Sequence, residues 1–483
     1  MESNDSGNGR DNTFDPSRRR LLAGLAATTA GAAGVVSRSS QGAARTEGLP
    51  DPGSSDIDHI VVVMMENRSF DHYLGWVPGA NGIQQGLSFK DTTGQAYSTF
   101  ALSSTGYGYQ GCGYADPDHS YGGGRTEYDN GAMDGFLLTQ PAGDQFPIGY
   151  YTRNDVLFYS GCADNWTICD TYHTGILSCT LPNRMYMHAG QTDRLSNTLT
   201  TSTLPTIWDA LLAANVPCRY YYSDTPILAL WGDKYTKEYP ISFKLQQFVT
   251  DFSASGTPPA VSYIDPYMGY SIAEALGTAW DDHPYSDIRD GQCFLNYIYN
   301  VLRSSPVWDK TLLVINYDEW GGFFDHVPPP VGPVSTAEAA LGNDGRLGIR
   351  VPCVLIGPRA RRGYVEHTQF DPNAILNMIG WRFGVTPPGV RADWSSNVAL
   401  ALDFDDPPNT SAPVFNVSYD GKTGPFPLSA PFTPPSDFTT DRFGGLCIFH
   451  KGAEQPEIRR RHVAHVTEVQ EIQNLGRAYG FKI

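Results

Sequence analysis

The sequence is short of basic charge, and this limits the partners that it can bind. Lys and Arg number 34 against 51 Asp and Glu, which gives a formal net charge of -17 and a pI near 5.0. A protein that binds nucleic acid usually presents a basic face to the phosphates. We therefore expect no nucleic-acid partner.

Long apolar runs are also missing. No stretch reaches the roughly 18 consecutive apolar residues that a membrane-spanning helix requires. The apolar stretch that follows Arg20 is short and is interrupted by Gly and Thr. We therefore expect at most peripheral contact with a membrane.

The eight cysteines form no C-x-x-C pair, which argues against a zinc ribbon. No C-x-P-x-R motif is present to supply the modified cysteine of a sulfatase, since the nearest match, CTLPNR, has its Pro one place too late. Cys162, Cys169 and Cys179 lie close together in the chain, but the sequence does not reveal which cysteines pair, if any.

The first 45 residues resemble an export signal. Arg18 and Arg19 precede Leu21, Leu22 and a stretch of small residues, the pattern of a Tat-type signal peptide. A disordered Arg-rich tail is the alternative. With the signal, the chain is a soluble exported protein, secreted or held in the periplasm or at the cell surface, and the Tat translocation machinery is a partner. Residues 46–56 are rich in Gly, Pro, Ser and Asp and are typical of a linker.

The rest of the chain predicts an α/β fold. Short apolar segments such as 60–65, 261–265 and 311–317 alternate with helical patterns, which favours a mostly parallel central sheet with flanking helices. Residues 78–150 predict long loops over the active-site face. After residue 405 the composition changes, so we divide the chain into a catalytic domain (57–405) and a small carboxy-terminal extension (406–483) of unknown role.

Acidic and amide side chains follow two of the predicted strands. Glu66 and Asn67 come directly after the apolar run 60–65, and Asp318 and Glu319 come directly after 311–317. Ligands of open parallel sheets bind at the carboxyl ends of the strands, and such oxygens suit a hard cation. A helix cap at Glu66 and Asn67 is the alternative for the first pair.

Two glycines follow Glu319, and Asp325 and His326 come next. Glycine allows the backbone to turn sharply and to approach a ligand closely. Several acids within nine residues repel one another, and a bound divalent cation is the simplest compensation. A solvated acidic loop is the alternative.

Thr180 precedes Pro182, a residue suited to the first turn of a helix. The amino end of a helix stabilises both an alkoxide and a phosphoryl oxygen. An ordinary Thr N-cap is the alternative. Cys179 is a competing nucleophile, but no base is adjacent to it in the sequence.

Four histidines lie beside acids in loop-like settings, and their similar settings suggest a shared pocket in which they contact phosphate, protonate a leaving group or bind metal. A single histidine in such a setting is more often a surface or structural residue. These four are His119, His283, His326 and His367.

Taken together, the motifs resemble the bacterial phospholipase C and acid phosphatase family of phosphoesterases. They run in order from about residue 57 to residue 405. The motifs are ENRSFDHYLG, DPDHS, NGAMDGF, GYYTRNDV, CDTYH, TLPNR, DDHP, YDEWGGFFDHVPPP and GPRARRGYVEHTQFD.

The resemblance implies an alkaline-phosphatase-like α/β fold and a metal-assisted phosphate ester hydrolase with a hydroxyl nucleophile. It implies that Thr180 is the nucleophile and also contacts one or more divalent ions. The implied metal ligands are Glu66, Asn67, Asp318 and Glu319. The implied phosphate pocket consists of His119, His283, His326, His367 and Asp325.

The chain departs from the family at 177–179, where Leu-Ser-Cys stands in place of the frequent Gly-Pro. The tail 406–483 has no counterpart that we can name. The leading functional hypothesis is a phospholipase C that hydrolyses phospholipid phosphodiesters through Thr180. A broad acid phosphatase acting on phosphate monoesters is the close alternative, and an exported binding protein without catalysis is a third.

Overall fold

The computed structural model describes residues 46–105, 108–111, 114–269, 279–419, 422–423 and 456–483. The predicted Tat-type signal (1–45) and the segment 424–455 lie outside the described residues. Within the described part of the chain, no helix is both long enough and apolar enough to cross a membrane.

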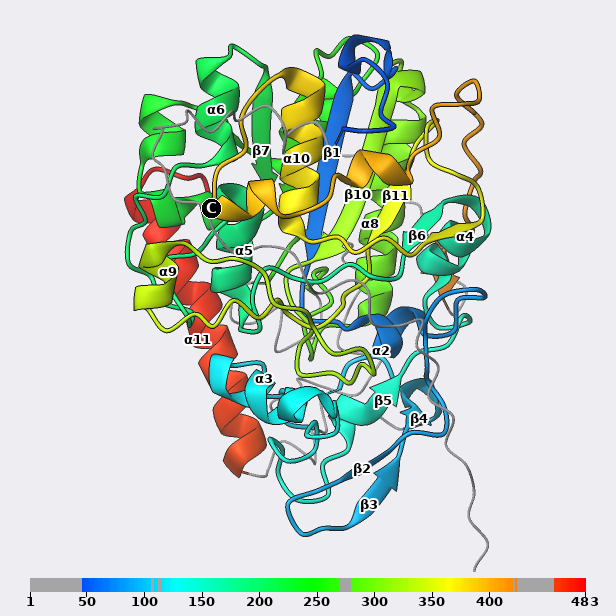
Figure 1. The fold of residues 1–483 in the computed structure, drawn as a ribbon, viewed down its shortest axis with the longest axis vertical. Helices are drawn as coiled ribbons and strands as arrows, with labels where there is room; N and C mark the ends of the chain where they lie inside the picture. The colour runs from blue at the N-terminus through cyan, green and yellow to red at the C-terminus, as the bar shows by residue number, and fades with distance from the viewer. Residues whose placement is uncertain (1–45, 106–107, 112–113, 270–278, 420–421, 424–455) are drawn as a thin grey trace, which may run out of the picture.

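An eight-stranded sheet forms the centre of the molecule (Figure 1). Among these eight strands, β11 alone is antiparallel to its neighbours, and every other adjacent pair is parallel. The predicted mostly parallel α/β sheet is therefore confirmed. In sheet order the strands are β12 (Tyr364–Glu366), β6 (Thr167–Cys169), β11 (Val354–Ile356), β10 (Thr311–Tyr317), β1 (His59–Met65), β9 (Val261–Asp265), β7 (Cys218–Tyr222) and β8 (Ser242–Lys244).

Strand β1 lies between β10 and β9 and is buried on both faces, as its β-branched apolar run predicts. Its last residue, Met65, is paired with Tyr317, the last residue of β10. The two strands therefore end at the same level. Glu66 and Asp318, which follow them, leave the sheet side by side.

Helices cover both faces of the sheet. In Figure 1, α5 and α10 lie in front of the strands and α8 lies behind them, where it packs against α4. The helices are α2 (Phe70–Leu74), α3 (Tyr121–Tyr128), α4 (Leu157–Asn165), α5 (Thr180–Ala189), α6 (Ile207–Ala213), α7 (Leu245–Asp251), α8 (Ile288–Arg303), α9 (Thr336–Ala340), α10 (Pro372–Phe383) and α11 (Pro456–Ala478).

Local sequence signals explain several helix ends. Thr206 and Asp209 form a reciprocal capping box at the start of α6. Helix α10 has Asp371 as its N-cap and Pro372 in its first turn. Its C-cap is Gly384, whose φ of +69° is in the left-handed region that favours glycine.

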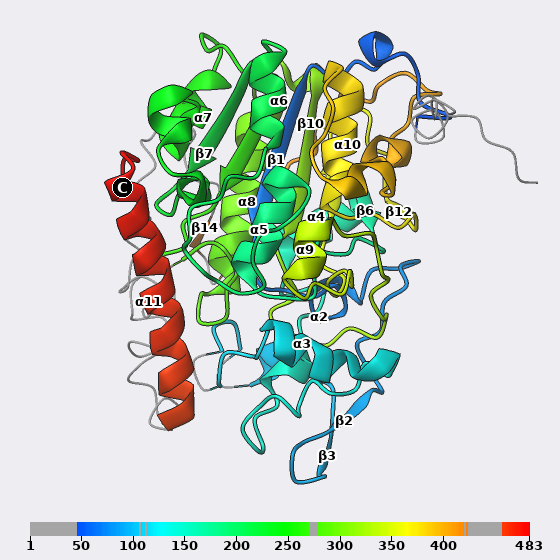
Figure 2. The ribbon, with the colours of Figure 1, turned by 60° about the vertical axis from the view of Figure 1, so that its left-hand side comes forward.

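A second layer covers the carboxyl ends of the strands. Figures 1 and 2 show α3 and the small strands β2 and β3 below the end of β1, on the side of α2. The segment 78–150, predicted as long loops, thus contains short elements as well. The small paired strands are β2 (Ser88–Lys90) with β3 (Ala96–Ser98), β4 (Phe100–Ala101) with β5 (Gly149–Tyr150), and β13 (Ser418–Tyr419) with β14 (Lys422–Thr423).

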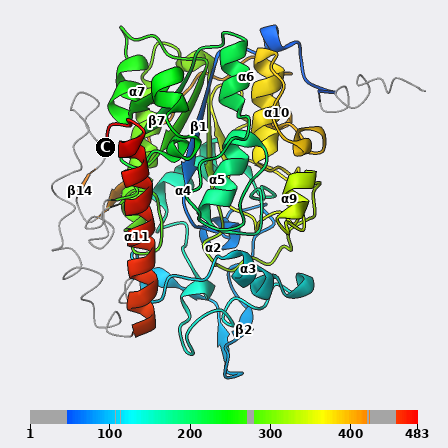
Figure 3. The ribbon, with the colours of Figure 1, turned by 90° about the vertical axis from the view of Figure 1, so that its left-hand side faces the viewer.

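The last helix, α11, spans both layers. Figures 1 to 3 show it running along one edge of the molecule, from the side of β7 down to the layer that contains α3. After the helix, Phe481 packs edge-on against Tyr222 of β7. The end of the chain therefore lies beside the carboxyl ends of the strands as well as beside the sheet.

Candidate active site

The two acidic pairs meet at the carboxyl ends of β1 and β10. Glu66, Asn67, Asp318 and Glu319 are all buried. The Asn67 amide donates a hydrogen bond to Asp318 Oδ1 at 3.3 Å, and the Glu319 amide donates to the same oxygen at 2.7 Å. Two segments that lie some 250 residues apart in the sequence thus form one buried acidic site.

Asn67 has the backbone strain that is common at functional sites. Its φ is +63°, which few non-glycine residues adopt. Its side chain is buried, and neither Oδ1 nor Nδ2 has a hydrogen-bond partner among the described residues. Glu319 Oε1 is likewise buried and has no hydrogen-bond partner in the described part of the chain. Such buried polar atoms are costly unless a ligand satisfies them.

The glycines that follow Glu319 allow this close packing. Gly321 has a φ of +68°, and a Cβ on it would lie 2.3 Å from the Asn67 carbonyl oxygen. Its amide donates to Glu319 Oε2 at 2.6 Å. The predicted sharp turn and close backbone approach are therefore present at Gly321.

Arg184 of α5 lies buried among three carboxylates: Glu66, Asp318 and Asp265, the last residue of β9. Its Nε donates to Asp318 Oδ2 at 3.0 Å and its Nη1 donates to Asp265 Oδ1 at 2.9 Å, while Nη2 lies 3.5 Å from Glu66 Oε2. The sequence motif TLPNR contains this arginine, but sequence reasoning did not identify it as the partner of the acids. One guanidinium does not neutralise all of them, because Glu319 adds a fourth carboxyl group.

Burial and the remaining negative charge raise the pKa values of two of these acids, Asp318 and Glu319. Burial raises the pKa of Asp318 to about 7, with Glu66 adding to the rise and Arg184 opposing it. Burial also raises the pKa of Glu319 well above its ordinary value, and the charge of Asp318 adds to this shift. Without a further cation, the site therefore holds fewer ionised carboxylates than it has carboxyl groups.

The donor set fits a divalent cation. It offers carboxylate oxygens from Glu66, Asp318 and Glu319 and an amide oxygen from Asn67, which are the ligands that hard cations prefer. The unsatisfied Asn67 Oδ1 and Glu319 Oε1 are the atoms that a bound ion would satisfy.

Thr180 lies at this acidic site. It is the first residue of α5, and its hydroxyl donates a hydrogen bond to Glu66 Oε1 at 3.2 Å. The N-cap position belongs to Cys179, and the structure gives no side-chain capping bond there. The interpretation of Thr180 as an ordinary N-cap is therefore wrong. Burial raises the pKa of Cys179 to about 12, so this thiol is a poor competing nucleophile.

The acidic strand ends are neither a helix cap nor part of a solvated loop. Helix α2 begins at Phe70 with Ser69 as its N-cap, so neither Glu66 nor Asn67 caps it. Asp318, Glu319 and Asp325 are buried, which excludes a solvated acidic loop.

Two of the four predicted histidines reach this site. His119 Nε2 lies 3.8 Å from Glu319 Oε1, and His283 Nε2 lies 3.9 Å from Asp116 Oδ2. The His119 Nδ1 is 2.8 Å from the Pro117 carbonyl oxygen, and His283 Nδ1 is 2.9 Å from the carbonyl oxygen of Pro284. Because a carbonyl only accepts, each Nδ1 carries the proton, and each Nε2 faces an acid.

The structure places the other three predicted residues in a second cluster. His326 Nδ1 lies 2.5 Å from Asp71 Oδ2, and Arg350 binds Asp71 and Asp325 at 3.2 and 3.0 Å. His367 Nδ1 lies 2.8 Å from Asp170 Oδ2, with 61% of its side chain exposed. A single pocket with all four histidines is therefore not what the contacts indicate, and the role of the second cluster in binding phosphate stays a prediction.

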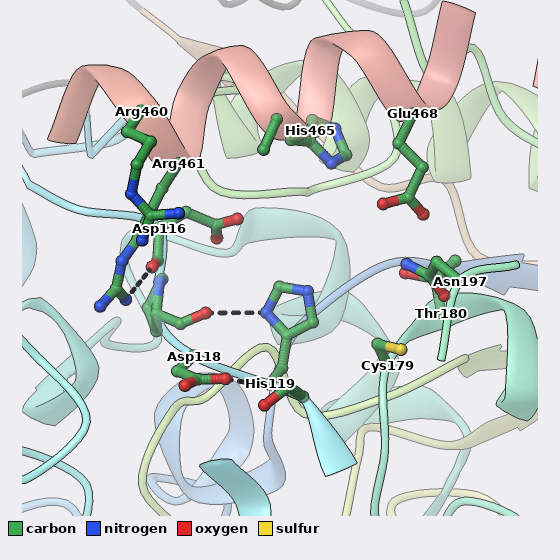
Figure 4. Close-up of a pocket in the computed structure, with 13 residues that line it drawn as sticks. Asp116, Asp118, His119, Cys179, Thr180, Asn197, Arg460, Arg461, His465 and Glu468 are labelled. Atoms are coloured by element: carbon green, nitrogen blue, oxygen red, sulfur yellow. Dashed lines mark hydrogen bonds between the residues drawn. The ribbon is translucent and has the colours of Figure 1, made fainter. Parts of the chain in front are cut away.

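A cavity of about 430 Å³ opens beside Thr180 (Figure 4). Its walls include Asp116, His119 and Asn197, and also residues of α11, the helix to which the sequence assigned no role. The sequence did not reveal that α11 lines the cavity, because the segment is charged throughout. The one signal is the spacing of residues 461, 464, 465 and 468, which places them on one face of a helix. The residues of α11 that line the cavity are Arg460, Arg461, Ala464, His465 and Glu468.

The six cysteines in the described residues are all buried, and no disulfide joins any two of them. They include Cys162, Cys169 and Cys179, whose pairing the sequence left open. Cys112 and Cys447 lie outside the described residues.

Comparison with known proteins agrees with the motifs. The chain is 32% identical to phospholipase C A of Mycobacterium tuberculosis, over 75% of this chain and 81% of that protein. It is 30% identical to non-specific phospholipase C3 of Arabidopsis thaliana, over 75% of this chain and 76% of that protein. With non-hemolytic phospholipase C of Pseudomonas aeruginosa it shares 28% identity, over 74% of this chain and 59% of that protein.

Among solved structures, the chain is similar to a protein in the alkaline phosphatase superfamily from Vibrio parahaemolyticus, with a TM-score of 0.32, 9% identity and coverage of 70% of this chain and 68% of that one. A likeness at this level does not bear on function. The model of the phosphoesterase family, by contrast, matches residues 57–386, most of the chain. The resemblance inferred from the motifs is thereby confirmed: the chain belongs to the phosphoesterase family and is a hydrolase of ester bonds.

Proposed function

We propose that this protein is an exported, metal-dependent phospholipase C that hydrolyses phospholipid phosphodiesters through Thr180, with residues 57–405 as its catalytic domain. The observation that carries the proposal is the hydrogen bond of 3.2 Å from the Thr180 hydroxyl to Glu66, at the wall of the 430 Å³ cavity. This bond joins a hydroxyl nucleophile to the acidic strand ends.

The ligands of the metal would be Glu66, Asn67, Thr180, Asp318 and Glu319. A bound divalent cation lowers the pKa of a coordinated hydroxyl and neutralises charge on a phosphoryl group. Arg184 pairs with Glu66, Asp265 and Asp318 and so holds two of these ligands, Glu66 and Asp318, beside each other. The chemistry of these ligands does not select one metal.

Thr180 would attack phosphorus through Oγ1. A bond forms between this oxygen and phosphorus, and the bond from phosphorus to the diacylglycerol oxygen breaks. The threonine proton passes to Glu66, its hydrogen-bond partner, and the departing oxygen takes a proton from a histidine. Water then hydrolyses the phosphothreonine and releases the phosphorylated head group.

His119 is our first choice for the proton donor, and His283 is our second. His119 lines the cavity that contains Thr180, and its Nε2 points toward Glu319. From the sequence, His283 and His367 are the first choices for this role, but His367 does not line the cavity and is largely exposed. For Asp325, His326 and His367 we retain a supporting role in phosphate binding through the second cluster.

The substrate is tested with purified protein on phosphatidylcholine, phosphatidylethanolamine, sphingomyelin and p-nitrophenyl phosphate, with and without chelator. Release of diacylglycerol from the phospholipids, lost on chelation and restored by a divalent ion, supports the phospholipase C. Turnover of the monoester alone would make the protein an acid phosphatase. No turnover with any ester or ion would favour a binding protein.

We also propose that the protein is exported through the Tat pathway and works outside the cytoplasm. The support is the twin arginine pair Arg18–Arg19 before a stretch of small apolar residues. A phospholipase C of this kind would meet its lipid at a membrane surface, by peripheral contact.

A further inference from the structure

Helix α11 forms one wall of the cavity that contains Thr180. Its residues 461, 464, 465 and 468 line the cavity, and their spacing places them on one face of the helix. The opposite wall carries Thr180, Asn197 and His119 (Figure 4). Any group bound at Thr180 therefore has α11 as its neighbour.

Contacts at both ends hold the helix in this place. Near its start, Arg461 donates to the carbonyl oxygens of Asp116 at 2.8 Å and Thr139 at 3.0 Å. Near its end, the buried Gln473 donates to Asp224 Oδ2 at 3.0 Å. These buried and partly buried bonds make α11 a fixed wall of the cavity.

Between these ends, two side chains face the predicted reaction centre. The ring of His465 stacks on His283 with 3.4 Å between ring centroids. The Glu468 carboxylate points from α11 toward Asn197 and Thr180 (Figure 4). The helix thus supplies both an aromatic ring and an acid to the cavity.

An acid is an unexpected neighbour for a phosphate site. Burial raises the pKa of Glu468 to about 7; His465 and His283 oppose this rise, and Glu66 and Asp116 add to it. The two arginines of this wall, Arg460 and Arg461, form ion pairs with Glu457 and not with Glu468. Among the described residues, no lysine or arginine forms an ion pair with Glu468.

A carboxylate beside a bound phosphate repels a phosphate monoester, which carries up to two negative charges. It attracts a phosphodiester whose second substituent is positively charged.

We propose that α11 is the specificity wall of this site and that Glu468 recognises a cationic head group, such as choline or ethanolamine, on the substrate's phosphate. This inference rests on the proposed hydrolysis at Thr180 and adds the class of head group and a residue that selects it. Glu468 is a specificity-determining residue and takes no part in bond breaking.

The test compares two diesters that release the same p-nitrophenol: p-nitrophenyl phosphorylcholine and ethyl p-nitrophenyl phosphate. Glu468→Gln keeps the shape of the side chain and removes its charge. Assays run at about pH 8, where an acid with a pKa near 7 is mostly ionised. We expect kcat/KM for the choline ester to fall about tenfold, the worth of one partly screened charge pair, and that for the ethyl ester to stay within about twofold.

The matched control is Glu471→Gln, which removes an acid from the exposed side of the same helix. It should leave both substrates unchanged, and thermal melting should show that both variants are folded. Equal losses on the two esters would overturn the proposal, because Glu468 would then act on catalysis or folding. Unchanged rates, or a gain on both esters, would overturn it as well.

A binding measurement separates this proposal from the proposed function. If the parent hydrolyses neither ester, calorimetric titration with phosphocholine and with inorganic phosphate still tests Glu468. We expect the parent to prefer phosphocholine and Glu468→Gln to lose that preference about tenfold. The same preference in both proteins would overturn the role of Glu468.

Discussion

Arg184 Nε donates to Asp318 Oδ2 at 3.0 Å, and this pair connects the helix of Thr180 to the end of β10. Arg184 follows Thr180 by four residues, so the nucleophile and the arginine lie one turn apart on the same face of α5. The arginine therefore fixes the distance between the hydroxyl and the acidic strand ends.

Replacing this arginine should destabilise the fold. In Arg184→Met, three buried carboxylates lose their shared partner, and breaking a buried charge pair costs about 3–5 kcal/mol. Urea unfolding measures the loss. A divalent ion should restore part of it if the acids share a cation. Arg153→Met, which breaks an exposed ion pair to Asp164, is the control and should cost less than about 1 kcal/mol.

Much of this architecture could be predicted because its signals are local. The buried runs before Glu66 and Asp318 identify the two strands, and strand-end acids at a parallel sheet predict a shared site. The register that sets Met65 beside Tyr317 is what makes that inference hold.

The remaining features depend on long-range packing, which a single sequence does not display. Arg184 reaches Asp265 and Asp318 across 81 and 134 residues, and no local pattern pairs them. His326 has the same acidic surroundings in sequence as His119, yet Asp71 holds it in a different cluster. The role of α11 was also hidden, because a charged helical face usually lies in solvent and here it lines a cavity.

Removing the predicted metal ligands should remove both metal and activity. Glu66→Ala and Asp318→Ala each take a carboxylate from the site whose unsatisfied Asn67 and Glu319 oxygens suit a cation. Elemental analysis of purified protein counts the bound metal. Asp325→Asn, in the second cluster, is the control and should keep the full count. Full metal occupancy in both alanine variants would refute the site.

The pairing of His326 with Asp71 should make stability depend on pH. Burial alone lowers the pKa of His326, but the hydrogen bond and charge of Asp71 outweigh it and raise the pKa overall. A raised folded pKa stabilises the protein below the unfolded value of about 6.5, and this stabilisation is lost as the pH rises through the folded value.

The free energy of unfolding should therefore differ most between the parent and His326→Gln near pH 6. This difference should shrink as the pH rises toward 9, over the pH range in which a single histidine loses its proton. Urea unfolding at several pH values measures it. Asp71→Asn is the control, since it should remove most of this pH dependence. A difference that grows with pH would contradict the assignment.

Export should depend on the twin arginines. Replacing Arg18 and Arg19 with Lys keeps the positive charge but removes the pair that the Tat pathway reads. The precursor should then accumulate inside the cell, as immunoblots of cell and culture fractions would show. Replacing Arg10 with Lys is the control. Unchanged secretion of the double variant would exclude the Tat assignment.

Thr180 carries most of the proposed mechanism, and its variants should separate rate from stability. Among the described residues, its hydroxyl hydrogen-bonds to Glu66 alone, and the N-cap position of α5 belongs to Cys179. Thr180→Ala should therefore cost only about 1 kcal/mol of folding free energy. Turnover should fall by three or more decades, about 4 kcal/mol of barrier. Thr180→Ser should keep partial activity because the hydroxyl remains and only the methyl that restricts its rotamer is lost.

Melting temperature and kcat, measured on the same preparations with metal content checked, decide among the mechanisms. A folded, metal-loaded Thr180→Ala enzyme that keeps its rate within about tenfold of the parent, a barrier change of only about 1.4 kcal/mol, would place the nucleophile elsewhere. Because burial raises the pKa of the neighbouring Cys179 to about 12, that thiol is a poor substitute. Cys179→Ser should therefore leave the rate nearly unchanged, and attack by an activated water would be the mechanism to test next.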